Sequence, residues 1–258
     1  MSALAVQTTQ LTGRSLRALR RQPAYVLVTL VQPMIWLLLF GQLFREVVAL
    51  PGFGTASYLE FLTPGVVVMT VLFSSGWSGM AFIDDMDRGV MDRMLSSPVH
   101  RGAMMASSTA YNGVTTVVQS LVVVLVAIVA GARFAGGVLG VAVMLLAAVL
   151  LAAAFASLSN GMALLVRTSE SLIGFSTMLT LPLSFLSTAI IAREAAPEWI
   201  QAVATWNPVD WAVVAGREAL SADPDWSAVG LRLAGLAVVA LLMTAVATRA
   251  FRTYQRSV

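Results

Sequence analysis

Residues 84–101 read DDMDRGVMDRMLSSPVHR and hold seven charged side chains. The runs on both sides, residues 61–83 and 104–130, carry no charge and are too long for the core of a soluble protein. A polar helix between two such runs would lie in water while being joined directly to two membrane spans. This arrangement indicates a segment that receives a push from a partner in the aqueous phase.

The chain as a whole is much more apolar than a soluble protein. It is 58% hydrophobic and 11% charged, whereas soluble domains carry about 25% charged residues. A helical span needs about 20 apolar residues, and six runs meet that length with Arg232 as their only charge. These runs are residues 25–44, 61–83, 104–130, 138–166, 172–192 and 228–247. We therefore predict an all-α integral membrane protein with six transmembrane helices, forming a single domain over residues 1–258.

The basic residues indicate how these spans are oriented. All 16 are Arg, and if six spans alternate with both ends inside, 11 of them fall on the inner side. The outer side then receives Arg45, Arg133, Arg193 and Arg217. Because inner loops of membrane proteins are enriched in basic residues, we predict that the N and C termini are cytoplasmic. The net charge of +3 then reflects topology, and we expect no nucleic-acid partner.

Missing residue types exclude several kinds of chemistry. A Walker A loop needs a Lys, and this chain has none, so it is not a conventional P-loop ATPase. The absence of Cys excludes disulfides, thiolate catalysis and iron–sulfur ligation. The one His, His100, cannot form a multi-His metal site within one chain. We therefore predict no catalytic residue, no metal ligand and no cofactor in this chain.

Two segments outside the spans have their own patterns. Residues 1–23 end in a basic stretch with Leu16 and Leu19 three positions apart, which predicts an interfacial helix with an Arg-rich face. Residues 193–227 contain four of the six Trp residues, and Trp favours the membrane–water boundary. Pro197 can start one short helix, and Asn207 and Pro208 can cap and start another. We predict a broken helical hairpin in the outer leaflet.

A few polar residues lie within the apolar runs. Gln32 precedes Pro33 in the first run, and packing between helices is the favoured interpretation over contact with a substrate. At helical spacing Asn112, Thr116 and Gln119 share one face of the third span, and Asn160 lies in the fourth. These polar residues should turn inward, either to pack between helices or to line a polar cavity, and the sequence leaves both open.

The charged segment itself has a helical pattern. Asp84 and Arg88 form an i,i+4 pair, which stabilises a helix by about 0.3 kcal/mol. An apolar stripe accompanies it, consisting of Val90, Met91, Met94 and Leu95. The segment therefore predicts an amphipathic helix that could lie on the membrane, on its own protein or on a partner.

Three stretches resemble one family, the type-two ATP-binding cassette (ABC) exporter permeases, and in particular their daunorubicin-resistance type. DRGVMDRMLSSPVHR (residues 87–101) resembles the family's cytoplasmic coupling segment, with an acid, Arg-Gly, and a Pro followed by Arg. LPLSFLSTAIIAREAAPEWIQAVATWNPVDWAVVAGREAL (residues 181–220) resembles its second signature, a Pro-containing fifth span followed by a broken outer hairpin. QPMIWLLLFGQLF (residues 32–44) resembles its first span.

The resemblance implies a membrane subunit in the bacterial plasma membrane that exports drugs, lipids or related amphiphilic compounds. It implies a dimer of two permeases, either two copies or two relatives, above two separate ATPases that bind ATP and Mg²⁺. Coupling to the ATPases would use Asp87, Arg88, Gly89, Asp92, Arg93, Pro98 and Arg101. The outer hairpin signature would be carried by Pro182, Pro197, Asn207, Pro208 and Arg217, which would help to close the extracellular end.

Two alternatives belong to other classes of protein. An ATP-independent secondary transporter or channel normally has ionisable groups at membrane depth, but here only Arg232 lies in a span, near its end. A membrane enzyme needs convergent acids, bases or a metal. The acids of the outer segment could form such a site, although scattered charges on interfacial helices explain them more simply. These acids are Glu194, Glu198, Asp210, Asp223 and Asp225.

Overall fold

The computed structural model describes residues 3–21, 23–46, 57–95 and 101–254, and all regular elements among them are helices. The first half of the chain forms α1 (Ala3–Arg20), α2 (Pro23–Leu43), α3 (Tyr58–Gly76), α4 (Met80–Asp87), α5 (Val90–Leu95) and α6 (Arg101–Val129). The second half forms α7 (Gly137–Val166), α8 (Ser169–Phe185), the 3-10 helix η2 (Arg193–Ala195), α9 (Glu198–Ala204), α10 (Pro208–Ala219) and α11 (Trp226–Tyr254).

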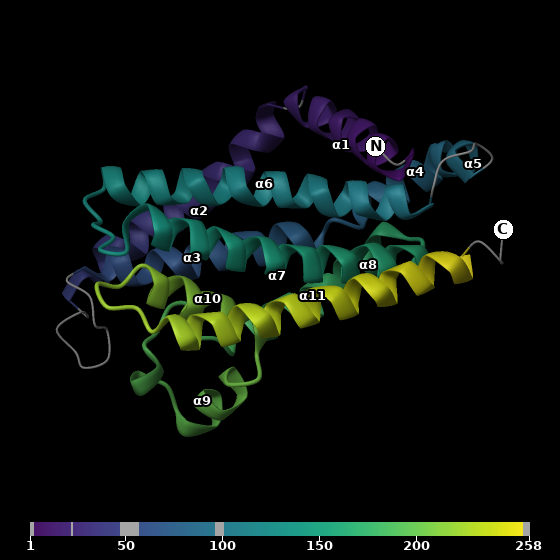
Figure 1. Ribbon diagram of the computed structural model, residues 1–258. Helices are drawn as coiled ribbons and strands as arrows, with labels where there is room; N and C mark the ends of the chain where they lie inside the picture. The colour runs from purple at the N-terminus through teal and green to yellow at the C-terminus, as the bar shows by residue number, and fades with distance from the viewer. Residues whose placement is uncertain (1–2, 22, 47–56, 96–100, 255–258) are drawn as a thin grey trace.

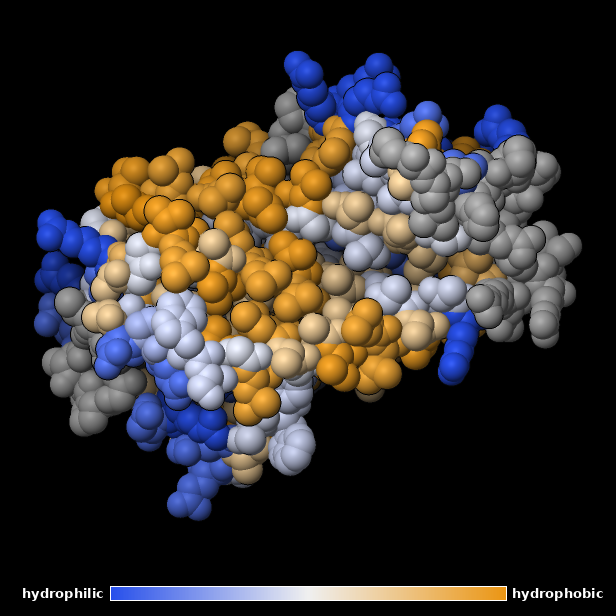
Figure 2. Space-filling view, viewed as in Figure 1, coloured by the Kyte–Doolittle hydropathy of each residue, from blue (hydrophilic) through white to orange (hydrophobic). Residues whose placement is uncertain are grey.

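Four helical segments of the described chain are long and apolar enough to cross a membrane. They are Tyr58–Asp87, Gly102–Val129, Gly137–Val166 and Trp226–Phe251, and a shorter apolar helix covers Leu27–Leu43. Figure 2 shows apolar side chains over the middle of the visible face and hydrophilic ones towards its two ends. The predicted all-α membrane protein is therefore confirmed at this level.

Helix α7 lies at the centre of the fold and packs against α3, α6, α10 and α11. The long helices run side by side, with α4 and α5 at one end of the molecule and α9 at the other (Figure 1). One buried cluster joins α4 and α5 to both terminal helices, because Phe82 and Met91 lie with Phe251 of α11 and Leu11 of α1 packs against them. Helix α1 and the last turn of α11 therefore contact the charged segment at the same end of the molecule.

Small residues allow the central helices to approach closely. The buried face of α7 includes Ala147, Ala148 and Ala152, and its Gly161 lies against the backbone of Ala247 in α11. In α3 a Cβ on Gly65 would overlap the carbonyl group of Ala189. Without a hydrophobic driving force between helices in lipid, such close contacts supply dispersion energy instead.

The second predicted span is interrupted. Residues 61–83 were expected as one helix, but α3 ends at Gly76 and α4 begins at Met80. Side chains from other helices bind the backbone at the break: the hydroxyl of Ser176 donates to the carbonyl of Gly76 at 2.6 Å, and the hydroxyl of Ser159 accepts from the N–H of Gly79 at 3.0 Å. These bonds satisfy backbone groups that the α-helix would otherwise pair.

The fifth predicted span, residues 172–192, is shorter than expected because α8 ends at Phe185. The side chain of Asn207 donates to the carbonyls of Leu183 and Leu186 at 2.8 and 2.9 Å. The carboxylate of Asp210 accepts from the backbone N–H of Thr188 at 2.7 Å. Polar side chains at the start of α10 therefore form hydrogen bonds with the backbone of residues 183–188. The uncharged composition of residues 172–192 does not reveal that the helix ends there.

The Gly65 contact yields a stability prediction. Gly65→Ala should destabilise the protein by about 1–3 kcal/mol, because the added methyl group meets backbone rather than a movable side chain. Gly174→Ala is the matched control, since Gly174 lies in α8 with no atom within 4 Å of an added Cβ. Thermal unfolding of both variants in detergent checks this. Equal melting temperatures would contradict the close approach of α3 to residue 189.

Candidate functional site

The charged segment forms two short helices instead of the single helix expected over residues 84–101. Helix α4 ends at Asp87 and α5 begins at Val90, with Gly89 between them at φ +61°. The N–H of Arg88 donates to the carbonyl of Asp84, and the N–H of Gly89 donates to that of Met86. Gly is favoured at such a left-handed helix end because it has no Cβ. The Arg-Gly pair is thus the break in the segment.

The apolar side of this segment lies on its own protein. Phe82, Ile83 and Met91 are buried in a cluster with Met104 and Met105 of α6. The predicted apolar stripe is therefore confirmed at Met91. The side chains of Asp92, Met94, Leu95 and Arg101, and all of residues 96–100 with Pro98, lie outside the described residues.

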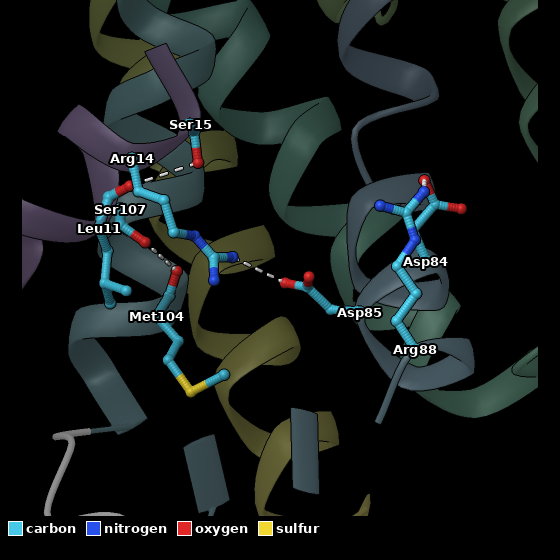
Figure 3. A network of polar contacts seen from close by, with 8 residues as sticks. All are labelled: Leu11, Arg14, Ser15, Asp84, Asp85, Arg88, Met104 and Ser107. Atoms are coloured by element: carbon cyan, nitrogen blue, oxygen red, sulfur yellow. Dashed lines mark hydrogen bonds and ion pairs between the residues drawn. The ribbon is translucent and has the colours of Figure 1, made fainter. Parts of the chain in front are cut away.

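The charged side of the segment faces water. Arg88 and Asp84 form the expected i,i+4 ion pair at 3.8 Å, with side chains 75% and 59% exposed (Figure 3). Asp87 and Arg93 are exposed as well, and Nε of Arg93 donates to the carbonyl of Gly89. Because these side chains are exposed, they are accessible to a partner. An ion pair this exposed contributes little to the stability of the protein itself.

A second ion pair links the segment to α1. Arg14 lies 3.1 Å from Asp85, with side chains 50% and 26% exposed (Figure 3). Helix α1 packs along α6, where the hydroxyl of Thr12 donates to the carbonyl of Ser107 at 3.4 Å. The sequence analysis missed this pair because no local pattern relates residues 71 positions apart.

The break between α3 and α4 is held by a polar cluster that joins Ser78 of the break to side chains of two helices, α6 and α7. Ser78 donates to Oδ1 of Asn160 at 3.1 Å and accepts from Nδ2 of Asn112 at 2.7 Å. Nδ2 of Asn160 donates to the hydroxyl of Ser108 at 2.8 Å. Asn112 and Asn160 are 7% and 0% exposed, so within one chain they connect helices rather than line an open cavity.

The other predicted inward-facing residues have different surroundings. Thr116 is buried, and Gln119 accepts from the hydroxyl of Ser74 at 3.3 Å. Gln32 is exposed on α2, although Pro33 beside it is buried. Gln32 is therefore not covered by another described helix of this chain, and its predicted contact between helices stays a prediction. Its neighbours on the sequence did not reveal which face of α2 is covered.

The hairpin of residues 193–227 contains a polar network that joins α10 to α3 and to the end of α8. Arg217 donates to the carbonyls of Phe61 and Thr188, at 3.3 Å and 2.9 Å for Nη2, and its guanidinium lies 3.6 Å from the centre of the Phe61 ring. Asp210 is 2% exposed and accepts from both the N–H and the hydroxyl of Thr188. Asp210 is thus a structural acid that the sequence analysis named only as one of several outer acids.

The charge of Arg217 persists in this setting. Helix α10 lies outside the candidate spans, and burial lowers the pKa of Arg217 to about 10 while the carboxylate of Asp210 raises it. The guanidinium is therefore cationic at neutral pH and able to hold both carbonyls. No group of three or more His, Cys, Asp or Glu residues that could hold a metal occurs among the described residues.

The two predicted short helices of the hairpin are present. Asn207 caps α10 by accepting from the N–H of Val209, and Pro208 is the first helical residue, both as expected. Pro197 precedes α9 as its cap rather than beginning it, and Pro182 lies inside α8, where its carbonyl accepts from Leu186. The predicted role of these residues in closing the extracellular end stays a prediction.

Known proteins match nearly the whole chain. The ABC-2 type transporter family matches residues 6–220. The chain is 29% identical over 229 residues to the daunorubicin resistance ABC transporter permease protein DrrB1 of Streptomyces coeruleorubidus, covering 88% of this chain and 80% of that protein. It is 29% identical over 196 residues to the putative transport permease ycf38 of Cyanophora paradoxa, covering 76% and 67%. It is 23% identical over 251 residues to the probable doxorubicin resistance ABC transporter permease protein DrrC of Mycobacterium tuberculosis, covering 96% and 90%.

The polar cluster at the break predicts that replacing Asn160 lowers the stability of the protein more than replacing Gln32 does. Asn160→Leu should destabilise the protein by about 1–2 kcal/mol, because Ser78 and Ser108 each lose a buried partner. Gln32→Leu should have no such effect, because Gln32 is exposed. Melting temperatures in detergent check both. A larger loss for Gln32→Leu would contradict the assignment of Asn160 to the interior.

The network around Arg217 predicts that stability depends on the guanidinium of this residue. Arg217→Met should cost about 1–3 kcal/mol, because two carbonyls lose their donor and the buried Asp210 loses a neighbouring cation. Arg193→Met is the control within the same hairpin. Among the described residues, the side chain of Arg193 donates to Gln201 and Thr205, both within the hairpin itself. Proteolysis of residues 193–227 in the purified protein should be faster for Arg217→Met alone.

Proposed function

The chain belongs to the ABC-2 type transporter family, and from this membership we propose that it exports an amphiphilic compound with energy from a separate ATPase. It is a multi-pass membrane permease of the bacterial plasma membrane and not itself an enzyme. The observation that carries the proposal is the exposed charged side of α4 and α5, whose opposite side is packed on the helices of the membrane.

We propose six spans with cytoplasmic termini, formed by α2, α3 with α4, α6, α7, α8 and α11, within a single permease domain over residues 1–258. Support comes from the first helix and the end of the last helix, which both lie at the end of the molecule that carries α4 (Figure 1). At the opposite end, Trp199 and Trp206 are 62% and 81% exposed around α9. This arrangement places α9 and α10 in the outer leaflet and α1 at the inner surface.

The proposed coupling residues are Asp87, Arg88, Gly89, Asp92, Arg93, Pro98 and Arg101. Nucleotide binding would move the partner ATPase against α4 and α5, and the packed side of these helices would pass that motion to α3 and α6. The left-handed conformation at Gly89 orients α5 relative to α4. Such coupling requires contacts that differ between two states of the complex, which the exposed charges can supply.

The proposed assembly is two permeases, as a homodimer or with a related permease, above two ABC ATPases that bind ATP and Mg²⁺. The exposure of Gln32 on the apolar helix α2 supports a second permease, because an amide in lipid needs a protein or water partner. In this assembly Gln32 would face a partner helix or the transport cavity, together with polar residues of α6 such as Gln119. Membrane lipid covers the remaining apolar surface.

We propose that the cargo is a drug, a lipid or a related amphiphile. The support is that two of the similar proteins are named for resistance to daunorubicin and doxorubicin. Within the described part of the chain, no observation favours an ATP-independent transporter, a channel or an enzyme. Disabling the phosphate-binding Lys of the partner ATPase would abolish transport in the proposed mechanism, whereas an ATP-independent transporter would keep it.

Two measurements test the coupling proposal. Purification of the tagged chain from its native membrane should recover a P-loop ATPase in equal amount. Arg88→Glu should then reduce permease-stimulated ATP hydrolysis severalfold without reducing membrane insertion, because it inverts an exposed charge in the coupling segment.

Arg133→Glu is the matched control, because it makes the same charge change on the exposed turn between α6 and α7, at the other end of the molecule. It should hydrolyse ATP at the unaltered rate. An equal loss in both variants would indicate a general effect of charge on the complex. Full activity of Arg88→Glu would remove Arg88 from the coupling site.

A further inference from the structure

Helix α4 presents three different sides, and each has a separate environment. Successive residues of an α-helix are rotated by about 100°, so Asp84, Asp87 and Arg88 share one side and Phe82, Ile83 and Met86 share another. The first set is exposed, while the second packs into the buried cluster. Asp85 lies between the two sides and is the residue that α1 contacts.

Helix α1 is well placed to hold Asp85. It packs along α6, Leu11 reaches the same buried cluster as α4, and Thr12 donates to the carbonyl of Ser107. Residues 1–45 contain no Asp or Glu, so no acid within α1 competes for Arg14. Figure 3 shows the guanidinium of Arg14 directed from α1 towards Asp85, while Arg88 turns to Asp84 on the other side of α4.

We propose that Arg14 is a positioning residue for coupling: through Asp85 it fixes the rotation of α4, so that Asp84, Asp87 and Arg88 face the partner ATPase. Beyond the hydrogen bond of Gly79 at its start, α4 is held on its packed side by apolar contacts, and such contacts leave the helix free to rotate because they are not directional. An ion pair at the boundary of the packed side removes that freedom. The inference rests on the proposed coupling function and adds α1 to it.

The ion pair of Arg14 and Asp85 affects the orientation of α4 rather than the total stability of the protein. Exposed ion pairs contribute little to the free energy of unfolding, and both partners here are partly exposed. Reversal of one charge changes the orientation of α4, because two like charges then repel each other. Asp84, Asp87 and Arg88 would then turn away from the partner ATPase. Restoring an opposite pair in the reverse order should restore the orientation.

A charge-exchange experiment tests this in proteoliposomes that contain the permease with its ATPase. Arg14→Glu and Asp85→Arg should each reduce permease-stimulated ATP hydrolysis by about threefold to fivefold, the factor expected for losing a partly exposed pair. The double variant Arg14→Glu/Asp85→Arg should recover most of the activity. Arg17→Glu is the matched control in the same helix and should leave the rate unaltered. Within the described part of the chain, the guanidinium of Arg17 donates to the carbonyl of Gly13 in its own helix.

The outcomes separate the pair from general effects. Equal losses in Arg17→Glu and Arg14→Glu would mean that the basic charge of α1 matters and the contact with Asp85 does not. A double variant as inactive as either single variant would overturn the positioning role. Loss in the single variants with recovery in the double variant has no explanation in a purely independent effect of each residue.

A second measurement does not need the ATPase. Because the chain contains no Cys, Arg14→Cys/Asp85→Cys introduces one pair of thiols without background. A short cleavable bifunctional reagent should join them within the permease in membranes, whereas Arg17→Cys/Asp85→Cys should react poorly. Failure of the first pair to cross-link overturns the inference and leaves the proposed transport function untouched. If the first pair cross-links but Arg88→Glu leaves permease-stimulated ATP hydrolysis unaltered, the result would instead contradict the proposed function.

Discussion

Lipid offers no hydrogen bonds, so every interrupted helix inside this protein needs polar side chains at its break. Two interruptions depend on this constraint. At residues 77–79 the backbone is bound by Ser159 and Ser176, and the side chain of Ser78 by Asn112 and Asn160. Beyond α8, Asn207, Asp210 and Arg217 bind the backbone of residues 183–188. In both places the partners come from distant parts of the chain.

These two breaks separate the closely packed middle of the molecule from two ends with different contacts. The middle is built on α7, whose small residues let α10 and α11 approach closely. At one end, α4 continues α3 after the first break and carries exposed charges away from the bundle. At the other end, α10 closes over α3 and the end of α8 through Arg217. A displacement of α4 can therefore be transmitted to α3, because hydrogen bonds hold residues 77–79 between the two helices.

The charged residues divide in a similar way. Asp210 and Asp85 are used inside the chain, by Thr188 and Arg14 respectively, whereas Asp84, Asp87 and Arg88 remain exposed. Composition alone treats these acids alike. Their environments differ because packing chooses which side of each helix is covered, and that choice separates structural acids from the ones available to a partner.

The sequence by itself determined that this protein lies in a membrane, and it determined several local features of the fold. Long uncharged runs predicted membrane helices, the spacing of Asp84 and Arg88 predicted their pair, and Asn207 with Pro208 predicted the start of α10. These features depend on residues near one another in the chain. Tertiary structure alone decided the breaks after Gly76 and Phe185, the exposure of Gln32, and the contact of Arg14 with Asp85. Those features depend on which helix faces meet, and hydropathy is nearly uniform around helices that lie in lipid.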